Sequence, residues 1–347
     1  MDTTKYIDAS RKIYNALGDY ESKYIFRERL LYSCTNEAEH IKNVIKTTDE
    51  GKWFNNILRD NKNLYIFGAG TWGKEIINVW TGQWLGFLDN NEALHGKAIQ
   101  GLPVFSPEEM ILKDSNAIVL ISSRLYYKEM YRQLIELGVP DSNIINIGQL
   151  LDRLAENQYF DLPYLKLNGN ETFVDVGSLD GMSSLRFLKW TNKKFDKIYC
   201  FEPDRKNVPK CESNLKEYIG HNKVEIIKKG AWSSETTLHF FSQGNGTSSF
   251  VMKEGESDEV EVTTMDKVLK GRKVTFIKMD IEGAEYQALR GCESIIRSQH
   301  PKLAICVYHK PEDVLELPQL ILNYNPDYKL YLRHYSITAA ETVLYAI

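Results

Sequence analysis

Two carboxylates that end short apolar runs are the first residues of this sequence with a clear chemical meaning: Asp175 in ETFVDVGSLDG and Glu202 in KIYCFEPD. Each run is rich in β-branched and aromatic residues and stops at turn residues, which predicts a buried strand. Residues 181–190 between them have the apolar spacing of a crossover helix. A right-handed βαβ unit then brings both strand ends, with their acids, to one rim of a sheet.

The glycines that follow the first acid indicate the kind of ligand. Gly177 and Gly181 let a ligand approach the backbone and let a helix amino end point at it. An acid that ends the second strand can accept both hydroxyls of a ribose. The loop lacks the G-x-G-x-x-G order of pyrophosphate sites, and Asp175 would repel a phosphate. We expect a cationic nucleoside such as S-adenosylmethionine, the alternative being an ordinary strand-to-helix turn.

Two later strand ends supply candidates for proton transfer. The run VTFIKMDIEG places Asp280 at the same rim if its strand is parallel to the first two, and Glu282 follows two residues on. His309 ends the next strand, ICVYHK, and its ordinary pKa suits a general base near neutrality. His334 in LYLRHYS competes for this role, and either histidine can instead be structural. A divalent metal held by Asp280, Glu282 and a histidine is an alternative that we do not expect.

A second glycine motif stands in the first half of the chain. Gly68, Gly70 and Gly73 complete G-x-G-x-x-G directly after a predicted strand and at the start of a helix. Asp89 follows at roughly the spacing of the ribose-binding acid in dinucleotide sites, about 20 residues on. The motif predicts a nucleotide site, and the alternative is a Rossmann-like domain that has lost its ligand.

The pattern of apolar and polar residues divides the chain into three parts. Residues 1–60 have helical spacing and form a helical lead-in. Residues 61–155 alternate strands and helices, as in a Rossmann-like domain of the nucleotide- or sugar-nucleotide-binding type. A charged, proline-containing connector spans roughly 150 to 170, and residues 160–347 form a second α/β domain. Its later strands are short and aromatic, which suits an antiparallel edge on a mostly parallel sheet.

The overall amino-acid composition limits the classes of protein to which the chain can belong. The chain has 347 residues, 43% of them hydrophobic and 26% charged, with a formal charge of −4, so a soluble two-domain protein without nucleic-acid partners is expected. Its five scattered cysteines indicate neither a zinc site nor a disulfide framework. No apolar run is long enough to cross a membrane and no targeting segment is evident, which favours a cytoplasmic location.

Seven motifs follow one another in the second half of the chain: ETFVDVGSLDG, CFEPD, KGAW, GTSSF, FIKMDIEGAEYQALRG, ICVYHKPED and YLRHYS. Through these motifs, residues 165–347 resemble the FkbM family of S-adenosylmethionine-dependent methyltransferases. Through IFGAGTWGKEI and GFLDNN, the amino-terminal part is similar to the small Rossmann-like domain that precedes sugar acyltransferases and some polysaccharide-biosynthesis enzymes. The resemblance implies a doubly wound, seven-stranded, mostly parallel fold. It also implies an O-methyltransferase acting on a hydroxyl of a sugar, nucleotide-sugar, glycan or related natural product.

The resemblance assigns cofactor contacts by position. The implied residues are Asp175, Gly177, Asp180 and Gly181 around the methionine part, Glu202 with Pro203 at the ribose, Gly230, Ala231 and Trp232 at the adenine edge, and Asp280 facing cofactor and acceptor. Asp180 either meets the cofactor ammonium or caps the following helix, and the cap is favoured. Residues 244–250 are a small-residue loop suited to cover the acceptor. The competing hypothesis is a nucleotide-sugar or NAD-binding enzyme centred on Gly68 to Asp89, and a homo-oligomer is an open alternative.

Overall fold

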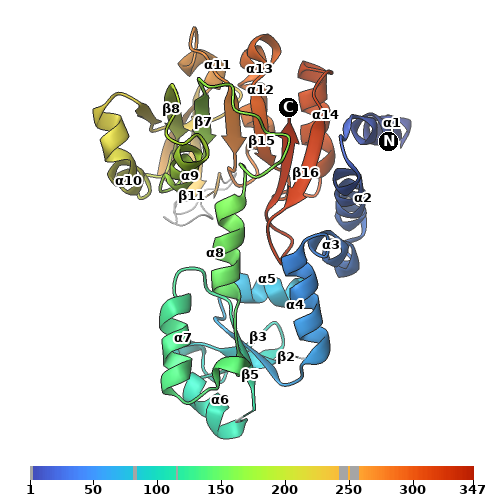
Figure 1. Cartoon of the computed structure of the whole chain (residues 1–347), viewed down its shortest axis with the longest axis vertical. Helices are drawn as coiled ribbons and strands as arrows, with labels where there is room; N and C mark the ends of the chain where they lie inside the picture. Colours follow the sequence, from blue (N-terminus) through green and yellow to red (C-terminus); the bar gives the residue numbers. More distant parts are fainter. Residues whose placement is uncertain (1–2, 81–83, 115, 242–248, 251–257) are drawn as a thin grey trace. The chain divides into compact units, whose positions relative to one another are not determined.

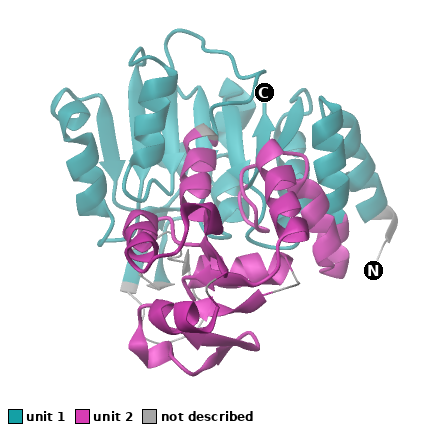
Figure 2. Cartoon of the chain, turned by 60° about the horizontal axis from the view of Figure 1, so that its bottom comes forward, with its two compact units in different colours: residues 1–30, 159–333, 342–347 teal, residues 31–158, 334–341 magenta. Residues whose placement is uncertain are grey.

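The computed structural model describes residues 3–80, 84–114, 116–241, 249–250 and 258–347. The chain folds into two compact units, coloured separately in Figure 2. Unit 1 consists of residues 1–30, 159–333 and 342–347, and unit 2 consists of residues 31–158 and 334–341. The first thirty residues therefore group with the carboxyl-terminal sheet, and a short late segment groups with the amino-terminal one.

A seven-stranded sheet forms the centre of unit 1, with the order β16-β17-β15-β14-β7-β8-β9. Its strands are β7 (Thr172–Val176), β8 (Lys197–Phe201), β9 (Val224–Ile227), β14 (Phe276–Met279), β15 (Lys302–Cys306), β16 (Leu330–His334) and β17 (Thr342–Ala346). The first five are parallel where they pair, and β17 runs antiparallel to β15. The predicted seven-stranded, mostly parallel α/β fold is confirmed.

Helices flank this sheet in the alternation expected of a doubly wound fold (Figure 1). They are α1 (Thr3–Ala16), α2 (Tyr20–Thr35), which begins in unit 1, α9 (Met182–Trp190), α10 (Val208–Gly220), α11 (Met265–Val268), α12 (Glu285–Arg290), α13 (Glu293–Gln299) and α14 (Asp313–Tyr324). Strands β7 and β14 are buried along their whole length, which explains why they read as continuous apolar runs. Phe173 on β7 stacks on Phe187 of α9 with ring centroids 4.5 Å apart, so the loop between them has two fixed ends.

The site is positioned by the point where the strand order reverses. Strand β7 lies between β8 and β14, so the loops that follow β7 and β14 leave the same edge of the sheet side by side. The Asp280 amide donates to the carbonyl of Val176 over 3.1 Å, which joins the two loops directly. Ligands of open α/β sheets bind at such a switch point.

Unit 1 also contains a separate four-stranded sheet. Strands β10 (Gly230–Ala231), β11 (Thr236–Phe241), β12 (Ser249–Phe250) and β13 (Asp258–Thr263) form it in the order β10-β13-β11-β12. In β13, buried Val260 and Val262 alternate with exposed Glu259 and Glu261, the pattern of a sheet with one solvated face. The closing strands β16 and β17 lie at one end of the main sheet, where β17 runs antiparallel to β15, so the predicted antiparallel edge is present.

Unit 2 contains a mixed six-stranded sheet in the order β3-β4-β2-β1-β5-β6. Its strands are β1 (Leu64–Phe67), β2 (Trp84–Leu88), β3 (Ala98–Ile99), β4 (Leu102–Phe105), β5 (Ile118–Ile121) and β6 (Ile144–Asn146), and only β3 is antiparallel to its neighbour among the pairs described. Its helices are α3 (Ala38–Ile45), α4 (Asp49–Asp60), α5 (Thr71–Val79), α6 (Pro107–Lys113), α7 (Tyr127–Glu136) and α8 (Ile147–Asn157). Helix α8 occupies part of the segment that the sequence predicts as a connector. No helix in the described part of the chain is both long and apolar enough to cross a membrane.

Candidate functional site

The loop after β7 has the left-handed backbone that its glycines allow. Gly177 has φ +76°, and a Cβ there would lie 2.1 Å from the carbonyl oxygen of Asp280, so no other residue fits without moving the second loop. Gly181 has φ +84° and begins α9. The Asp180 carboxylate accepts the amide hydrogen of Met182 over 3.1 Å, so it satisfies a free donor of the first turn as the favoured capping role requires.

Asp175 differs from expectation, because its carboxylate lies entirely inside the protein rather than at an open crevice. Its side chain is 0% exposed. The Ser183 and Ser184 hydroxyls of α9 donate to Oδ2 over 2.5 and 2.7 Å, and the Lys278 Nζ lies 3.2 Å from Oδ1. With its charge paired by Lys278, Asp175 is placed to hold the loop and the helix, and a direct contact with a cationic ligand has no support from this geometry.

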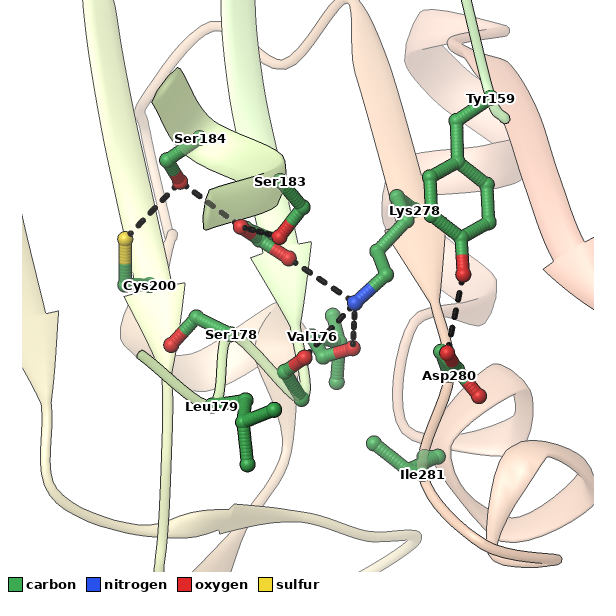
Figure 3. Close-up of polar contacts among 12 residues, drawn as sticks. Tyr159, Val176, Ser178, Leu179, Ser183, Ser184, Cys200, Lys278, Asp280 and Ile281 are labelled. Carbon is green, nitrogen blue, oxygen red and sulfur yellow. Dashed lines mark hydrogen bonds and ion pairs between the residues drawn. The ribbon is translucent and has the colours of Figure 1, made fainter. Parts of the chain in front are cut away.

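Lys278 is a site residue that the sequence analysis missed. Figure 3 shows its side chain reaching from β14 toward the turn at Val176. Its Nζ donates to the carbonyl of Gly177 over 2.7 Å. Burial would lower the pKa of Lys278, but Asp175 and Asp280 outweigh that effect and raise it, so the amine is charged. The available signal was one lysine inside the apolar run FIKM, since a buried lysine requires a partner.

Glu202 lies at the end of β8 and is 4% exposed. Its Oε2 accepts the amide of Leu179 over 2.7 Å, and its Oε1 accepts the amide of Asp204 over 2.9 Å. Burial raises the pKa of Glu202 to about 7 despite these hydrogen bonds. The Asn207 side chain also forms a hydrogen bond with this carboxylate. A carboxylate has about four lone-pair sites, so a hydroxyl donor can still bind here and would favour the ionised form. This remaining capacity to accept a hydrogen bond fits the ribose of S-adenosylmethionine.

Asp280 follows β14 and combines partial exposure with a dense set of partners. The Tyr159 hydroxyl donates to Oδ2 over 2.9 Å, as drawn in Figure 3, and the Tyr308 hydroxyl donates to Oδ1 over 3.3 Å. Burial would raise the pKa of Asp280, but Lys278 and His309 hold it below its usual value. Asp280 is therefore an ionised carboxylate with 25% of its side chain exposed at the rim. Tyr159 comes from the segment that the sequence predicts as a connector, and its role was not foreseen.

His309, just beyond β15, is enclosed by carboxylates. Its Nδ1 lies 3.0 Å from Glu285 Oε1, and its Nε2 lies 3.4 Å from Asp280 Oδ1 and 3.9 Å from Glu282 Oε1. Burial would lower the pKa of His309, but these acids outweigh it and raise the pKa to about 10. The sequence predicts an imidazole with a near-neutral pKa; in this geometry it is protonated at neutral pH and has no lone pair to accept a proton.

The remaining candidate residues in the second half of the chain are His334, residues 230–232 and the predicted covering loop. His334 ends β16, is 3% exposed and groups with unit 2. Gly230 and Ala231 are buried in β10, and the Trp232 amide donates to the carbonyl of Thr263 over 2.8 Å. Residues 244–248 of the predicted covering loop lie outside the described residues. Contact of the β10 segment with adenine and a catalytic role of His334 stay predictions.

The glycine motif of unit 2 lies in a tight turn between β1 and α5. Gly68 has φ +110°, and a Cβ at Gly73 would lie 2.1 Å from the carbonyl of Gly68. Gly70 begins α5, and a Cβ added there would meet nothing within 4 Å. The Asp89 oxygens accept the amides of Ala69 and Asn91, each over 2.9 Å. Asp89 therefore ties the turn together and keeps part of its capacity to accept a ribose hydroxyl. Nucleotide binding here stays a prediction.

Comparison with known families gives two matches along the chain. The methyltransferase FkbM domain matches residues 175–329, and the C2185-like amino-terminal domain matches residues 60–145. The first match begins at Asp175 and includes Glu202, Asp280 and His309, whereas Tyr159 lies outside it. No curated protein matches the chain.

One solved structure shares the fold, and others resemble a part of the chain. A methyltransferase FkbM from Methylobacillus flagellatus KT is 23% identical with a TM-score of 0.53, covering 84% of this chain and 92% of its own. An rRNA methylase from Streptococcus thermophilus is 15% identical with a TM-score of 0.33, covering 58% of this chain and 93% of its own. A fibrillarin from Aeropyrum pernix with natively bound S-adenosyl-L-methionine is 11% identical with a TM-score of 0.36, covering 56% and 74%. The chain is thus an S-adenosylmethionine-dependent methyltransferase whose residues 175–329 match the methyltransferase FkbM domain and whose residues 60–145 match a C2185-like domain ahead of it.

Proposed function

We propose that the chain transfers a methyl group from S-adenosylmethionine to a hydroxyl of a sugar, glycan or related natural product. The observation that carries the proposal is the ionised carboxylate of Asp280, which is partly exposed beside the glycine loop and is held by two tyrosine hydroxyls. A hydroxyl acceptor must lose a proton during methyl transfer, and a fixed carboxylate at the switch point can orient that hydroxyl and take the proton.

The proposed cofactor contacts follow from the loop geometry. Gly177 and Gly181 give the loop the left-handed backbone proposed to face the methionine part, and Glu202 with the adjacent Pro203 receives the ribose. Residues 230–232 are proposed at the adenine edge, as the family resemblance implies. When bound, the cofactor supplies a methyl group on a sulfonium that leaves as a neutral thioether. Asp175 acts behind the loop, where it and Lys278 fix the backbone that faces the ligand.

Proton transfer is assigned to the acidic group rather than to the imidazole. Asp280 is the proposed general base, and Glu282, whose side chain is 31% exposed, is the second candidate. Protonated His309 holds Asp280 in its ionised form and in place. His309 would serve as the base only after losing its proton, and His334 stays a weaker alternative because it is almost fully buried.

Methyl transfer is tested with purified chain, isotopically labelled S-adenosylmethionine and panels of free sugars, nucleotide-sugars and oligosaccharides. We expect label in at least one hydroxyl acceptor, and a loss of about 10²- to 10⁴-fold in kcat for Asp280→Asn with unchanged cofactor affinity. The matched control is Glu293→Gln, which removes an exposed carboxylate paired with Arg297 on α13 of the same unit. Label found only on an amine acceptor, or full activity of Asp280→Asn, would contradict the proposal.

The geometry of the Gly68 turn favours a second candidate function, nucleotide-sugar or NAD binding by unit 2. The open space at Gly70 permits close approach of a diphosphate to the start of α5. Calorimetric titration with NAD and UDP-sugars tests it, using Gly70→Asp as the blocking variant. Binding that survives this substitution would place the nucleotide elsewhere.

A further inference from the structure

Three side chains from separate segments converge beyond the ends of β14 and β15. Asp280 follows β14, Glu285 begins α12 and His309 follows β15. One oxygen or nitrogen atom of each lies within 4.8 Å of the corresponding atoms of the other two. Ligands about 2.1 Å from a metal ion stand roughly 3 to 4 Å apart, so small side-chain rotations would bring these atoms onto one ion.

A second observation is the unsatisfied state of the buried members of this group. The His309 side chain is 8% exposed and that of Glu285 is 0% exposed. Neither His309 ring nitrogen, nor Glu285 Oε2, has a hydrogen-bond partner among the described residues; the 3.0 Å approach of Nδ1 to Glu285 Oε1 is an ion pair without hydrogen-bond geometry. Buried polar atoms are normally hydrogen-bonded, so a buried imidazole that lies among acids without an aligned hydrogen bond at either nitrogen indicates a place for a ligand.

The surrounding charge and access also suit a cation. The Glu282 carboxylate adds a third acid, 3.9 Å from His309 Nε2. Asp280 and Glu282 are 25% and 31% exposed, so an ion can enter from the rim and reach the buried pair. The Glu285 Oε1 atom also accepts the amide of Ile281 over 2.8 Å, which fixes one oxygen and leaves Oε2 for a ligand.

We propose that a divalent transition-metal ion binds among Asp280, Glu285 and one ring nitrogen of His309, with Glu282 as an additional carboxylate at the rim. Two carboxylates with an imidazole suit Mn²⁺ or Zn²⁺, whereas Mg²⁺ and Ca²⁺ prefer oxygen ligands alone. An ion at this rim would lower the pKa of an acceptor hydroxyl beside Asp280. The inference goes beyond the proposed function, since ion binding is measured on the resting chain and does not require methyl transfer.

The test is calorimetric titration of the chelator-treated full chain with Mn²⁺, Zn²⁺ and Mg²⁺ separately. We expect one Mn²⁺ or Zn²⁺ per chain, bound at least about tenfold more tightly than Mg²⁺. Asp280→Asn and Glu285→Gln should each weaken Mn²⁺ binding by at least about tenfold. Glu293→Gln, the same chemical change at the surface, should leave it unchanged.

Because Glu285 is buried, its variant is first compared with the wild-type chain in thermal unfolding without metal, and Asp280→Asn provides the partly exposed substitute. If the wild-type chain binds none of the three ions at millimolar concentration, His309 serves as the internal counter-ion of these acids and the proposal is overturned. Equal Mn²⁺ affinity in the wild-type chain and both folded variants would overturn it as well.

Discussion

Asp175 on β7 and Lys278 on β14 occupy directly paired positions of neighbouring parallel strands, and their charged groups meet 3.2 Å apart inside the sheet. The same lysine amine donates to the carbonyl of Gly177, so the ion pair is connected to the loop that faces the cofactor. The sequence predicts the Asp175 charge next to a cationic ligand, but in the structure Lys278 neutralises it inside the sheet. Asp175 therefore acts on the ligand through the backbone of the loop.

The first prediction concerns the stability of this pair. Lys278→Met should lower the free energy of unfolding by about 3 to 5 kcal/mol, because it leaves the buried Asp175 carboxylate without a counter-charge. The measurement is equilibrium unfolding in urea. Lys189→Met, on the exposed face of α9, should change the same quantity by less than about 0.5 kcal/mol.

The double variant separates charge from packing. Asp175→Asn combined with Lys278→Met should be more stable than Lys278→Met alone, since no unpaired charge remains. If Lys278→Met unfolds at the wild-type urea concentration, the buried ion pair does not exist in solution.

The second prediction concerns Glu202 and pH. Its pKa is raised to about 7 in the folded chain, so the carboxyl is largely protonated at pH 6 and ionised at pH 8. A ribose hydroxyl donates to the ionised form, so affinity for S-adenosylmethionine should rise between pH 6 and pH 8 and then level off. Without ligand the sign is opposite for folding: the contribution of Glu202 to stability is complete below pH 4.5 and is lost as the pH rises through 7.

Substitution tests the same residue directly. Glu202→Ala should weaken S-adenosylmethionine binding by about 1.5 to 3 kcal/mol, through loss of charged hydrogen bonds. Glu202→Gln should remove most of the pH dependence between 6 and 8. A pH profile that is the same in the wild-type chain and in Glu202→Gln would show that another group titrates.

The third prediction concerns the protonation of His309. With a pKa raised to about 10, the imidazole of the metal-free chain should stay protonated throughout the range from pH 6 to pH 9. Its ring resonances, followed by NMR on chelator-treated protein, give the value. The contribution of this ion pair to stability is complete below pH 6.5 and is lost as the pH rises through 10.

A His309→Ala variant should lose turnover while its S-adenosylmethionine affinity stays within about twofold, since the imidazole acts through Asp280, the proposed base. His221→Ala, on the exposed turn after α10, serves as the matched control. Ring resonances that titrate near pH 6.5 would mean that the surrounding acids do not hold the proton, and His309 would then become the leading candidate for the base.

The fourth prediction concerns the turn at Gly177. Gly177→Ala should destabilise the chain and weaken S-adenosylhomocysteine binding, because φ is +76° and the new Cβ meets the Asp280 carbonyl at 2.1 Å. Gly169→Ala shares a positive φ of +83° but has nothing within 4 Å, so it measures the backbone strain alone. Similar unfolding curves for the two variants would show that the two loops are not in contact.

Much of the fold follows from the sequence, because buried parallel strands appear as continuous apolar runs and their carboxyl ends share an edge. The gathering of Asp280, Glu282 and His309 beyond neighbouring strands was predictable for this reason. The link between Asp175 and Lys278 was not, since it depends on the register of β14 against β7, which no local pattern reveals.

Other parts of the site depend on long-range packing in the same way. Tyr159 reaches Asp280 from a segment 121 positions earlier in the chain, where charge and proline indicate only a connector. The pKa of His309 is set by Glu285, which begins a helix and carries no sign of its partner in the sequence. The residue types predicted which side chains lie close together. Their ionisation states could be assigned only from the contacts that the structure shows.

The measurement that tests the central claim most directly is calorimetric titration of the full chain with S-adenosylmethionine, beside the same titration of Glu202→Ala. The predicted result is one bound cofactor per wild-type chain and affinity reduced by about 1.5 to 3 kcal/mol in the variant. Identical binding by the two proteins, or binding of NAD with no binding of S-adenosylmethionine, would contradict a methyl-donor site at the carboxyl ends of β7 and β8.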